Sequence, residues 1–101
     1  MYSENQFMVD FTLPEVLSEE FMNLIPTQRH EVNKLFIEGI LVNYMLSLEN
    51  AKLWAVFSAE SEYEVLQIIE ALPLTRFMTH QISMLTFNNT APEMVPSFSM
   101  N

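Results

Sequence analysis

Residues 61–87 read SEYEVLQIIEALPLTRFMTHQISMLTF, and this stretch decides the fold. Ser61 followed three residues later by Glu64 has the pattern of a capping box, in which both side chains satisfy backbone N–H groups at a helix start. Apolar residues then recur at helical spacing until Pro73, which ends the helix because the residue before a proline disfavours helical backbone. From Thr79 to Phe87 apolar and polar residues alternate. The stretch therefore predicts a helix, a sharp turn and a final strand.

Residues 6–13 also alternate and predict the first strand. Phe7, Val9 and Phe11 share its apolar face, so the residues between them point the other way. A helix is expected to follow, with Ser18 as its N-cap.

Two residues are expected to interrupt the middle of the chain. Pro26 lacks a backbone N–H and clashes with the preceding turn, so we expect it to kink or split the first helix. Gly39 is the only glycine and is placed to end that helix in the left-handed conformation. Residues 40–48 and 52–58 then predict a strand hairpin, with Asn50 at positive φ in its turn.

The predicted order is strand, helix, strand, strand, helix, strand. Two amphipathic helices can cover one face of an antiparallel sheet, so the expected fold class is α+β, ferredoxin-like βαββαβ, with the first and third strands central. Residues 1–5 are interpreted as a flexible N-terminus, residues 6–88 as a single domain, and residues 89–101 as an irregular tail that a neighbouring subunit could hold.

The second face of this sheet has no helix left to cover it. Met8, Leu85 and Phe87 are among the apolar residues predicted to lie there. Two copies that pack these faces together would remove them from water, which predicts a homodimer with the architecture of a dimeric α+β barrel.

The formal net charge is −9, with four Lys and Arg residues against thirteen Asp and Glu residues. So few cations argue against nucleic acid and anionic membranes as partners. The apolar runs are too short to span a membrane, and the lack of cysteine fits a cytoplasmic protein. His30 is interpreted as a surface residue and His80 as a partly buried structural residue on the helix-covered face. They have no ligand spacing with acidic residues, so we expect no metal and no cofactor.

Four segments carry a resemblance to a known family. They are Leu13-Pro14 after the first strand, Glu38-Gly39, Trp54-Ala55-Val56-Phe57, and Leu72-Pro73-Leu74 followed by Phe77-Met78. In these segments the chain resembles the muconolactone isomerase family. The resemblance implies an isomerase that shifts a double bond in a small unsaturated lactone by moving a proton, without a cofactor, and that assembles from dimers into larger rings.

The sequence departs from the family pattern on two strands. Residues 41–46 contain no base or cation, and Gln81 and Ser83 stand where the resemblance leads us to expect carboxylates. A proton shift through a carbanion needs a base and a group that holds the developing oxyanion. Two functions therefore stay open: a cofactor-independent isomerase acting on a small lactone or related carbonyl compound, and a non-catalytic small-molecule-binding or structural oligomer that has lost the family's active-site residues.

Asp10 is the one acidic residue inside a predicted strand, and it points away from the helix-covered face. Inside a dimeric barrel its carboxylate would be partly removed from water and could act as a base; the alternative is that it only reaches water or a donor near the strand end. The candidate substrate-binding residues are Asn43, Tyr44, Trp54, Gln81 and Ser83. The aromatic members could equally be core residues, and the polar members could form a network that fixes the dimer.

Overall fold

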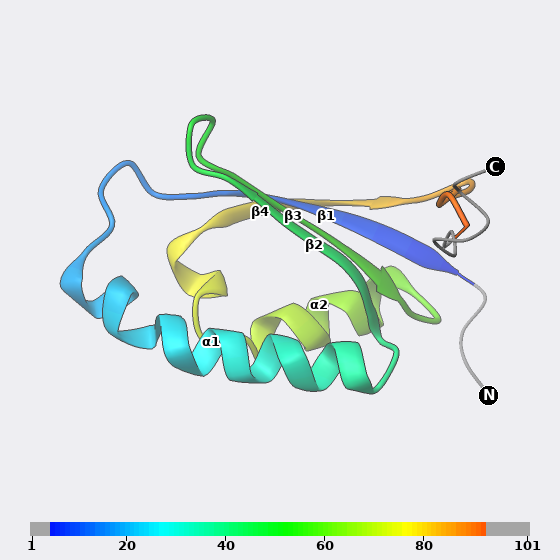
Figure 1. The fold of residues 1–101 in the computed structure, drawn as a ribbon, viewed down its shortest axis with the longest axis horizontal. Helices are drawn as coiled ribbons and strands as arrows, with labels where there is room; N and C mark the ends of the chain where they lie inside the picture. The colour runs from blue at the N-terminus through cyan, green and yellow to red at the C-terminus, as the bar shows by residue number, and fades with distance from the viewer. Residues whose placement is uncertain (1–4, 93–101) are drawn as a thin grey trace, which may run out of the picture.

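The computed structural model describes residues 5–92 and contains four strands, two α-helices and one short 3₁₀ helix (Figure 1). In chain order the elements are β1 (Gln6–Thr12), α1 (Glu19–Ile37), β2 (Leu41–Ser47), β3 (Lys52–Ser58), α2 (Glu62–Glu70), η1 (Thr75–Phe77) and β4 (Thr79–Met84). Within residues 5–92, no helix combines the length and the apolar character needed to cross a membrane.

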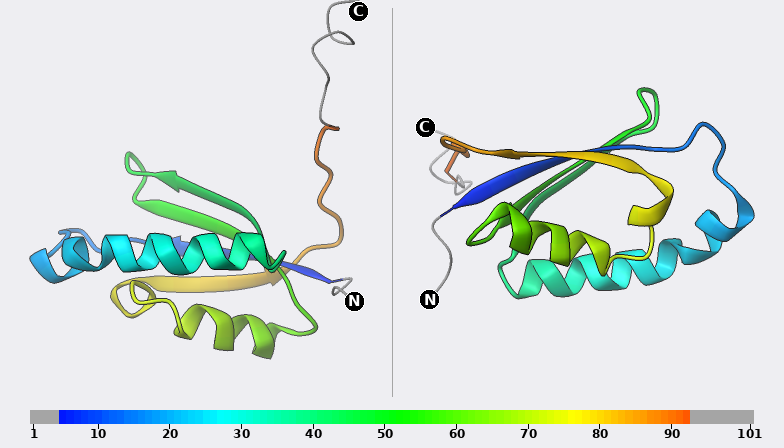
Figure 2. Two further views of the ribbon diagram at one scale, coloured as in Figure 1. Left: turned by 60° about the horizontal axis from the view of Figure 1, so that its bottom comes forward. Right: turned by 180° about the vertical axis from the view of Figure 1, so that it is seen from behind.

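The strands form one antiparallel sheet in the order β2-β3-β1-β4. The predicted βαββαβ order is confirmed, and β1 and β3 are central as expected. Both helices lie on the same side of the sheet, and the other side carries no helix (Figures 1 and 2). The molecule therefore has two layers, with one face of the sheet open.

The core lies between the helices and the sheet. Phe7, Val9 and Phe11 of β1 are buried there, as the alternation predicted. Each fully buried side chain of this size contributes roughly 1.5–3 kcal/mol relative to an exposed one. The largest fully buried side chains are Val9, Phe11, Phe57, Val65 and Ile69.

Short-range signals begin both helices. Ser18 Oγ accepts a hydrogen bond from the Phe21 N–H at 3.1 Å, and Ser61 Oγ accepts one from the Glu64 N–H at 3.2 Å. Each satisfies a backbone donor that the helix itself leaves without a partner. The caps predicted at Ser18 and Ser61 are therefore confirmed.

Gly39 ends α1 in the predicted left-handed conformation, with φ 76°. The next residue, Ile40, donates its N–H to the Leu35 carbonyl at 2.9 Å, which satisfies a carbonyl at the helix end. The chain thereby turns directly into β2.

Three local predictions need correction. Of the two effects expected of Pro26, the split does not occur: α1 continues through this residue, since a proline removes only one of the helix's hydrogen bonds. The positive φ of the hairpin falls on Ala51 (φ 54°), because the turn closes with the Ala51 N–H on the Leu48 carbonyl at 3.2 Å. The last strand, β4, ends at Met84 because its partner β1 begins at Gln6.

The side of the sheet away from the helices is called the open face below. Because paired residues on neighbouring strands share a face, the register fixes its members. The open face comprises Gln6, Met8, Asp10 and Thr12 of β1, Asn43, Met45 and Ser47 of β2, Lys52, Trp54, Val56 and Ser58 of β3, and Thr79, Gln81 and Ser83 of β4.

Phe87 follows β4 and is 74 % exposed, and Met45 is 43 % exposed, in accord with the predicted uncovered apolar surface. Residues 1–4 and 93–101 fall outside the described part of the chain. The proposed docking of the tail on a neighbouring subunit therefore concerns mostly residues that the structure does not describe.

Candidate functional site

Asp10 lies in the middle of β1, a central strand, with Trp54 of β3 on one side and Gln81 of β4 on the other. All three side chains belong to the open face. The structure thus places the predicted base away from the helices, as the alternation of β1 required.

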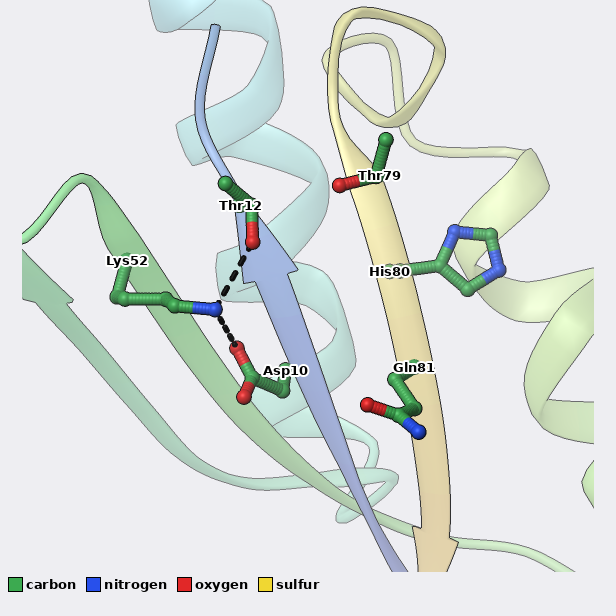
Figure 3. A pocket seen from close by; sticks show the side chains of 6 residues that line it. All are labelled: Asp10, Thr12, Lys52, Thr79, His80 and Gln81. Carbon is green, nitrogen blue, oxygen red and sulfur yellow. Dashed lines mark hydrogen bonds and ion pairs between the residues drawn. The ribbon is translucent and has the colours of Figure 1, made fainter.

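Lys52 is the residue that completes this site. Its Nζ lies 3.1 Å from Asp10 Oδ1 and 2.9 Å from Thr12 Oγ1 (Figure 3). The exposed fractions of the Asp10 and Lys52 side chains are 40 % and 33 %. The carboxylate is therefore half-exposed in the single chain and carries a fixed cationic partner. Among residues 5–92, only Oδ1 takes part in this pair, which leaves Oδ2 available to a ligand.

A shallow polar pocket of about 310 Å³ surrounds the pair. Thr12, Thr79 and Gln81 supply its other polar side chains. Hydroxyl and amide groups of this kind can donate hydrogen bonds to a carbonyl oxygen. The pocket therefore brings together a carboxylate, an ammonium group and neutral donors.

His80 contributes to the rim of this pocket, but its ring points away from Asp10 (Figure 3). The ring lies on the helix side of the sheet, 6.1 Å from the ring of Phe11. The predicted face is correct, whereas the predicted burial is wrong: His80 is exposed because β4 is an edge strand that the helices cover poorly. His30 is exposed on α1, as predicted.

Four of the five predicted substrate-binding residues share the open face with Asp10. Trp54 and Gln81 are its direct neighbours across the strands, while Asn43 and Ser83 lie one row further along the sheet. Asn43 Oδ1 is 3.5 Å from the amide nitrogen of Asn88, which follows β4. These side chains could line one continuous surface around the carboxylate.

Tyr44, the fifth predicted substrate-binding residue, lies on the other face of the sheet. It pairs with Ala55, whose side chain is fully buried on the helix side of the sheet. Asn43 and Tyr44 are consecutive strand residues and therefore point to opposite faces. Tyr44 faces a different hollow.

That second hollow lies between α1 and the sheet and has a volume of about 640 Å³. Its lining is mostly apolar and includes Phe21, Val32 and Leu53. Tyr44 and Gln28 are the polar pair within it: the Gln28 Nε2 group donates to the Tyr44 hydroxyl oxygen at 3.0 Å. Burial raises the pKa of Tyr44, while the hydrogen bond from Gln28 lowers it to a smaller extent.

Sequence reasoning missed Lys52 and Gln28, although each left a signal. Lys52 alternates with Trp54 and Val56 and so shares their face. Positions 25, 28 and 32 have the helical spacing of side chains that face the core, and Gln28 is the polar residue between the apolar Ile25 and Val32. A polar residue in that series usually has a buried hydrogen-bond partner.

The described residues contain no group of three or more His, Asp or Glu side chains that could hold a metal ion. At the open face, the described side chains around the pocket provide a carboxylate, an ammonium group and neutral polar groups.

These features define a ferredoxin-like α+β protein with a carboxylate–ammonium site on its open sheet face. The sequence profile of the family described as muconolactone delta-isomerase matches residues 6–89. The chain therefore belongs to the muconolactone isomerase family, and the predicted membership is confirmed.

A crystal structure of muconolactone isomerase has the same fold, with a TM-score of 0.68 and 18 % sequence identity. The match covers 89 % of this chain and 97 % of the other. No curated protein sequence matches the chain. The structural likeness supports the ferredoxin-like α+β assignment independently of the sequence profile.

Proposed function

We propose that this protein is a cofactor-independent isomerase that moves a proton on a small lactone or related carbonyl compound, with Asp10 as the base. The observation that carries the proposal is the contact between Asp10 and Lys52 on the open face. Proton abstraction beside a carbonyl needs a base and a group that stabilises the oxyanion, and the adjacent carboxylate and ammonium group support a proposal in which they take these two roles. Membership of the muconolactone isomerase family supports the class of reaction.

In the proposed reaction, Asp10 accepts a proton from a carbon atom conjugated with the ligand's carbonyl. The electron pair of the broken C–H bond moves through the conjugated system to the carbonyl oxygen, where the Lys52 ammonium group stabilises the negative charge. The protonated Asp10 then returns the proton to a different carbon, and the double bond shifts. Thr12 holds the ammonium group in place through its hydroxyl oxygen. Atoms and charges balance without a cofactor.

We further propose that a second copy of the chain covers this site. Apolar open-face residues such as Met45 are exposed to water in the single chain, and a second sheet packed on them would bury them. Exclusion of water would also strengthen the interaction of Lys52 with a developing oxyanion. In this arrangement Trp54 forms a wall beside the ligand, and Asn43, Gln81 and Ser83 orient it.

A second candidate function is ligand binding or structural assembly without catalysis. The observation in its favour is that Asp10 and Lys52 are the only charged residues among the open-face residues defined above. The amide of Asn88 contacts both Gln6 and Asn43, which shows that neutral groups on this side can join segments of the chain. Such a network could fix a dimer without taking part in a reaction.

The test is the isomerisation of α-angelica lactone, a small unsaturated lactone, followed by NMR in D₂O. Deuterium incorporation reports proton abstraction even when little product accumulates. We expect Asp10→Asn to lower the rate roughly 10²- to 10⁴-fold, the usual range for loss of a general base. Lys52→Met is expected to lower it by about 10²-fold through loss of oxyanion stabilisation.

Lys34→Met is the matched control, because Lys34 forms an exposed ion pair with Glu31 on α1, on the other side of the molecule. Its rate should equal that of the unmodified protein. Equal rates for the unmodified protein and Asp10→Asn would show that Asp10 is not the base. Binding of the lactone without deuterium incorporation would support the non-catalytic function.

A further inference from the structure

We propose that the hollow between α1 and the sheet is a second binding site, which takes a small, mostly apolar molecule through one acceptor oxygen held by the Tyr44 hydroxyl. This site lies on the opposite side of the sheet from Asp10 and does not depend on the function proposed there. The walls of the hollow, the direction of two hydrogen bonds and the protonation of Tyr44 support this assignment.

The walls define the kind of molecule that fits. The hollow has a volume of about 640 Å³, and its lining is dominated by apolar side chains, among them Phe21, Val32, Leu53 and Met78. Small-molecule sites in proteins are typically concave, mostly apolar and equipped with a few fixed polar groups, with volumes of about 300–1,000 Å³. A molecule of one or two rings is of suitable size.

The backbone N–H of Leu74 fixes the orientation of the Gln28 amide. This N–H can only donate, and it lies 3.1 Å from Gln28 Oε1. The amide nitrogen of Gln28 must therefore be on the other side of the group, where it donates to the Tyr44 oxygen at 3.0 Å. Gln28 is 4 % exposed, so neighbouring side chains hold it in this position.

The direction of this bond determines what Tyr44 can offer to a ligand. Its oxygen already accepts a hydrogen bond from Gln28, so its own O–H proton is directed elsewhere. Within residues 5–92 the hydroxyl donates to no protein acceptor. An O–H group in a mostly apolar hollow gains more from an acceptor than one in water, because little competes with it. Tyr44 is therefore a prepared donor for a ligand carbonyl, ester or ether oxygen.

The protonation state of Tyr44 supports this role. Burial raises the pKa of its hydroxyl above the ordinary value of 10.0. The group therefore keeps its proton throughout the physiological pH range and stays a donor.

The test uses two bicyclic molecules of nearly equal shape: 1-indanone, which has a carbonyl oxygen, and indane, which has none. Methionine residues labelled with ¹³C in their methyl groups report the site by NMR. Met22 and Met78 line the hollow, whereas Met8 and Met45 belong to the open face. We expect 1-indanone to shift the signals of Met22 and Met78 in a saturable manner and to leave those of Met8 and Met45 unchanged.

Tyr44→Phe removes the donor and keeps the ring. It is expected to weaken 1-indanone about two- to tenfold, the range that one neutral hydrogen bond provides, and to leave indane binding unchanged. Tyr63→Phe is the matched control, because Tyr63 is 69 % exposed on α2 and does not line the hollow. It should bind both molecules like the unmodified protein.

Two results would overturn the proposal. One is a folded Tyr44→Phe variant that binds 1-indanone as tightly as the unmodified protein does. The other requires no variant: 1-indanone leaves Met22 and Met78 unshifted up to its solubility limit, or shifts the open-face methionines equally. Unshifted signals of Met22 and Met78 would show that the hollow is closed in solution or filled by another part of the chain, and equal shifts at the open-face methionines would show that binding is not specific to the hollow.

Discussion

Lys52 reaches diagonally across the two central strands to Asp10, with 3.1 Å between Nζ and Oδ1. The register explains the diagonal, because Lys52 pairs directly with Thr12 and Asp10 pairs directly with Trp54. The ammonium group therefore contacts two residues of β1, Thr12 directly opposite and Asp10 two positions away on the same face. Among the strand residues assigned to the open face, Lys52 is the one cation and Asp10 the one carboxylate, and the two central strands hold them together.

Loss of this ion pair should have little effect on stability, although it should have a large effect on turnover. The exposed fractions of the two side chains, 33 % and 40 %, leave the pair screened by water. We expect Lys52→Met to lower the free energy of unfolding by at most about 1 kcal/mol, the usual upper value for surface pairs. Urea unfolding in samples dilute enough to be monomeric measures this. If Lys52→Met lowered the free energy of unfolding by more than about 2 kcal/mol, the ion pair would be behaving as a buried pair and not as a half-exposed one.

Much of the fold could be predicted because its signals are local. The alternation around Phe7, Val9 and Phe11 set which side of β1 is buried. The Ser61 cap and the positive φ of Gly39 depend on neighbours within a few residues. Such features need no knowledge of distant strands, so the sequence alone predicted them correctly.

The site was harder to predict because it depends on pairing between strands. The contact of Lys52 with Asp10 depends on the register of β1 against β3. A two-residue shift that moved Lys52 away from Asp10 would leave every side chain on its face of the sheet and still lose the contact. The opposite faces of Asn43 and Tyr44 follow from strand geometry alone, because consecutive strand residues point to opposite sides of a sheet. The turn residue at positive φ, Ala51, has no side-chain signal at all.

Substitutions at Gly39 and Ala51, the two residues with positive φ, should change the free energy of unfolding in opposite directions. Both have positive φ, 76° and 54°, which costs a residue with a Cβ roughly 1 kcal/mol or more. A Cβ at position 39 would meet no atom within 4 Å, so Gly39→Ala should destabilise through the backbone alone, by about 1 kcal/mol. Ala51→Gly should stabilise by up to a similar amount. Denaturant unfolding measures both, and a shift of the same sign in the two variants would contradict this account.

Tyr44 should make stability fall at high pH. Burial raises its pKa in the folded chain, so the unfolded chain loses this proton first as the pH rises past about 10. Between the unfolded and folded pKa values the unfolded state binds fewer protons, and the free energy of unfolding decreases with pH. The contribution of Tyr44 to the free energy of unfolding is fully present below the pKa that the residue has in the unfolded chain. It is lost as the pH rises through the higher pKa that the residue has in the folded chain.

The measurement is urea unfolding at several pH values from about 8 to 11, a range that brackets the ordinary tyrosine pKa. Tyr44→Phe should have a smaller loss of stability over this range than the unmodified protein. Tyr63→Phe, which changes an exposed residue, should keep the full loss. If the Tyr44→Phe curve runs parallel to that of the unmodified protein, Tyr44 is not the source of the pH dependence.

The open face should mediate dimer formation. Met8 lies near its centre, half-buried in the single chain, between Val56 and Ser83 of the neighbouring strands. A second sheet packed on this face would enclose the side chain, so Met8→Glu would bury a carboxylate of each copy without a partner, at a cost of several kcal/mol. We expect this variant to raise the dimer dissociation constant, measured by sedimentation equilibrium, at least about 100-fold.

Ile37→Glu is the control: it adds the same charge at the end of α1, where Ile37 is 85 % exposed, and should leave the dimer intact. Equal dissociation constants for both variants, or a monomer in the unmodified protein, would show that this face stays open to water.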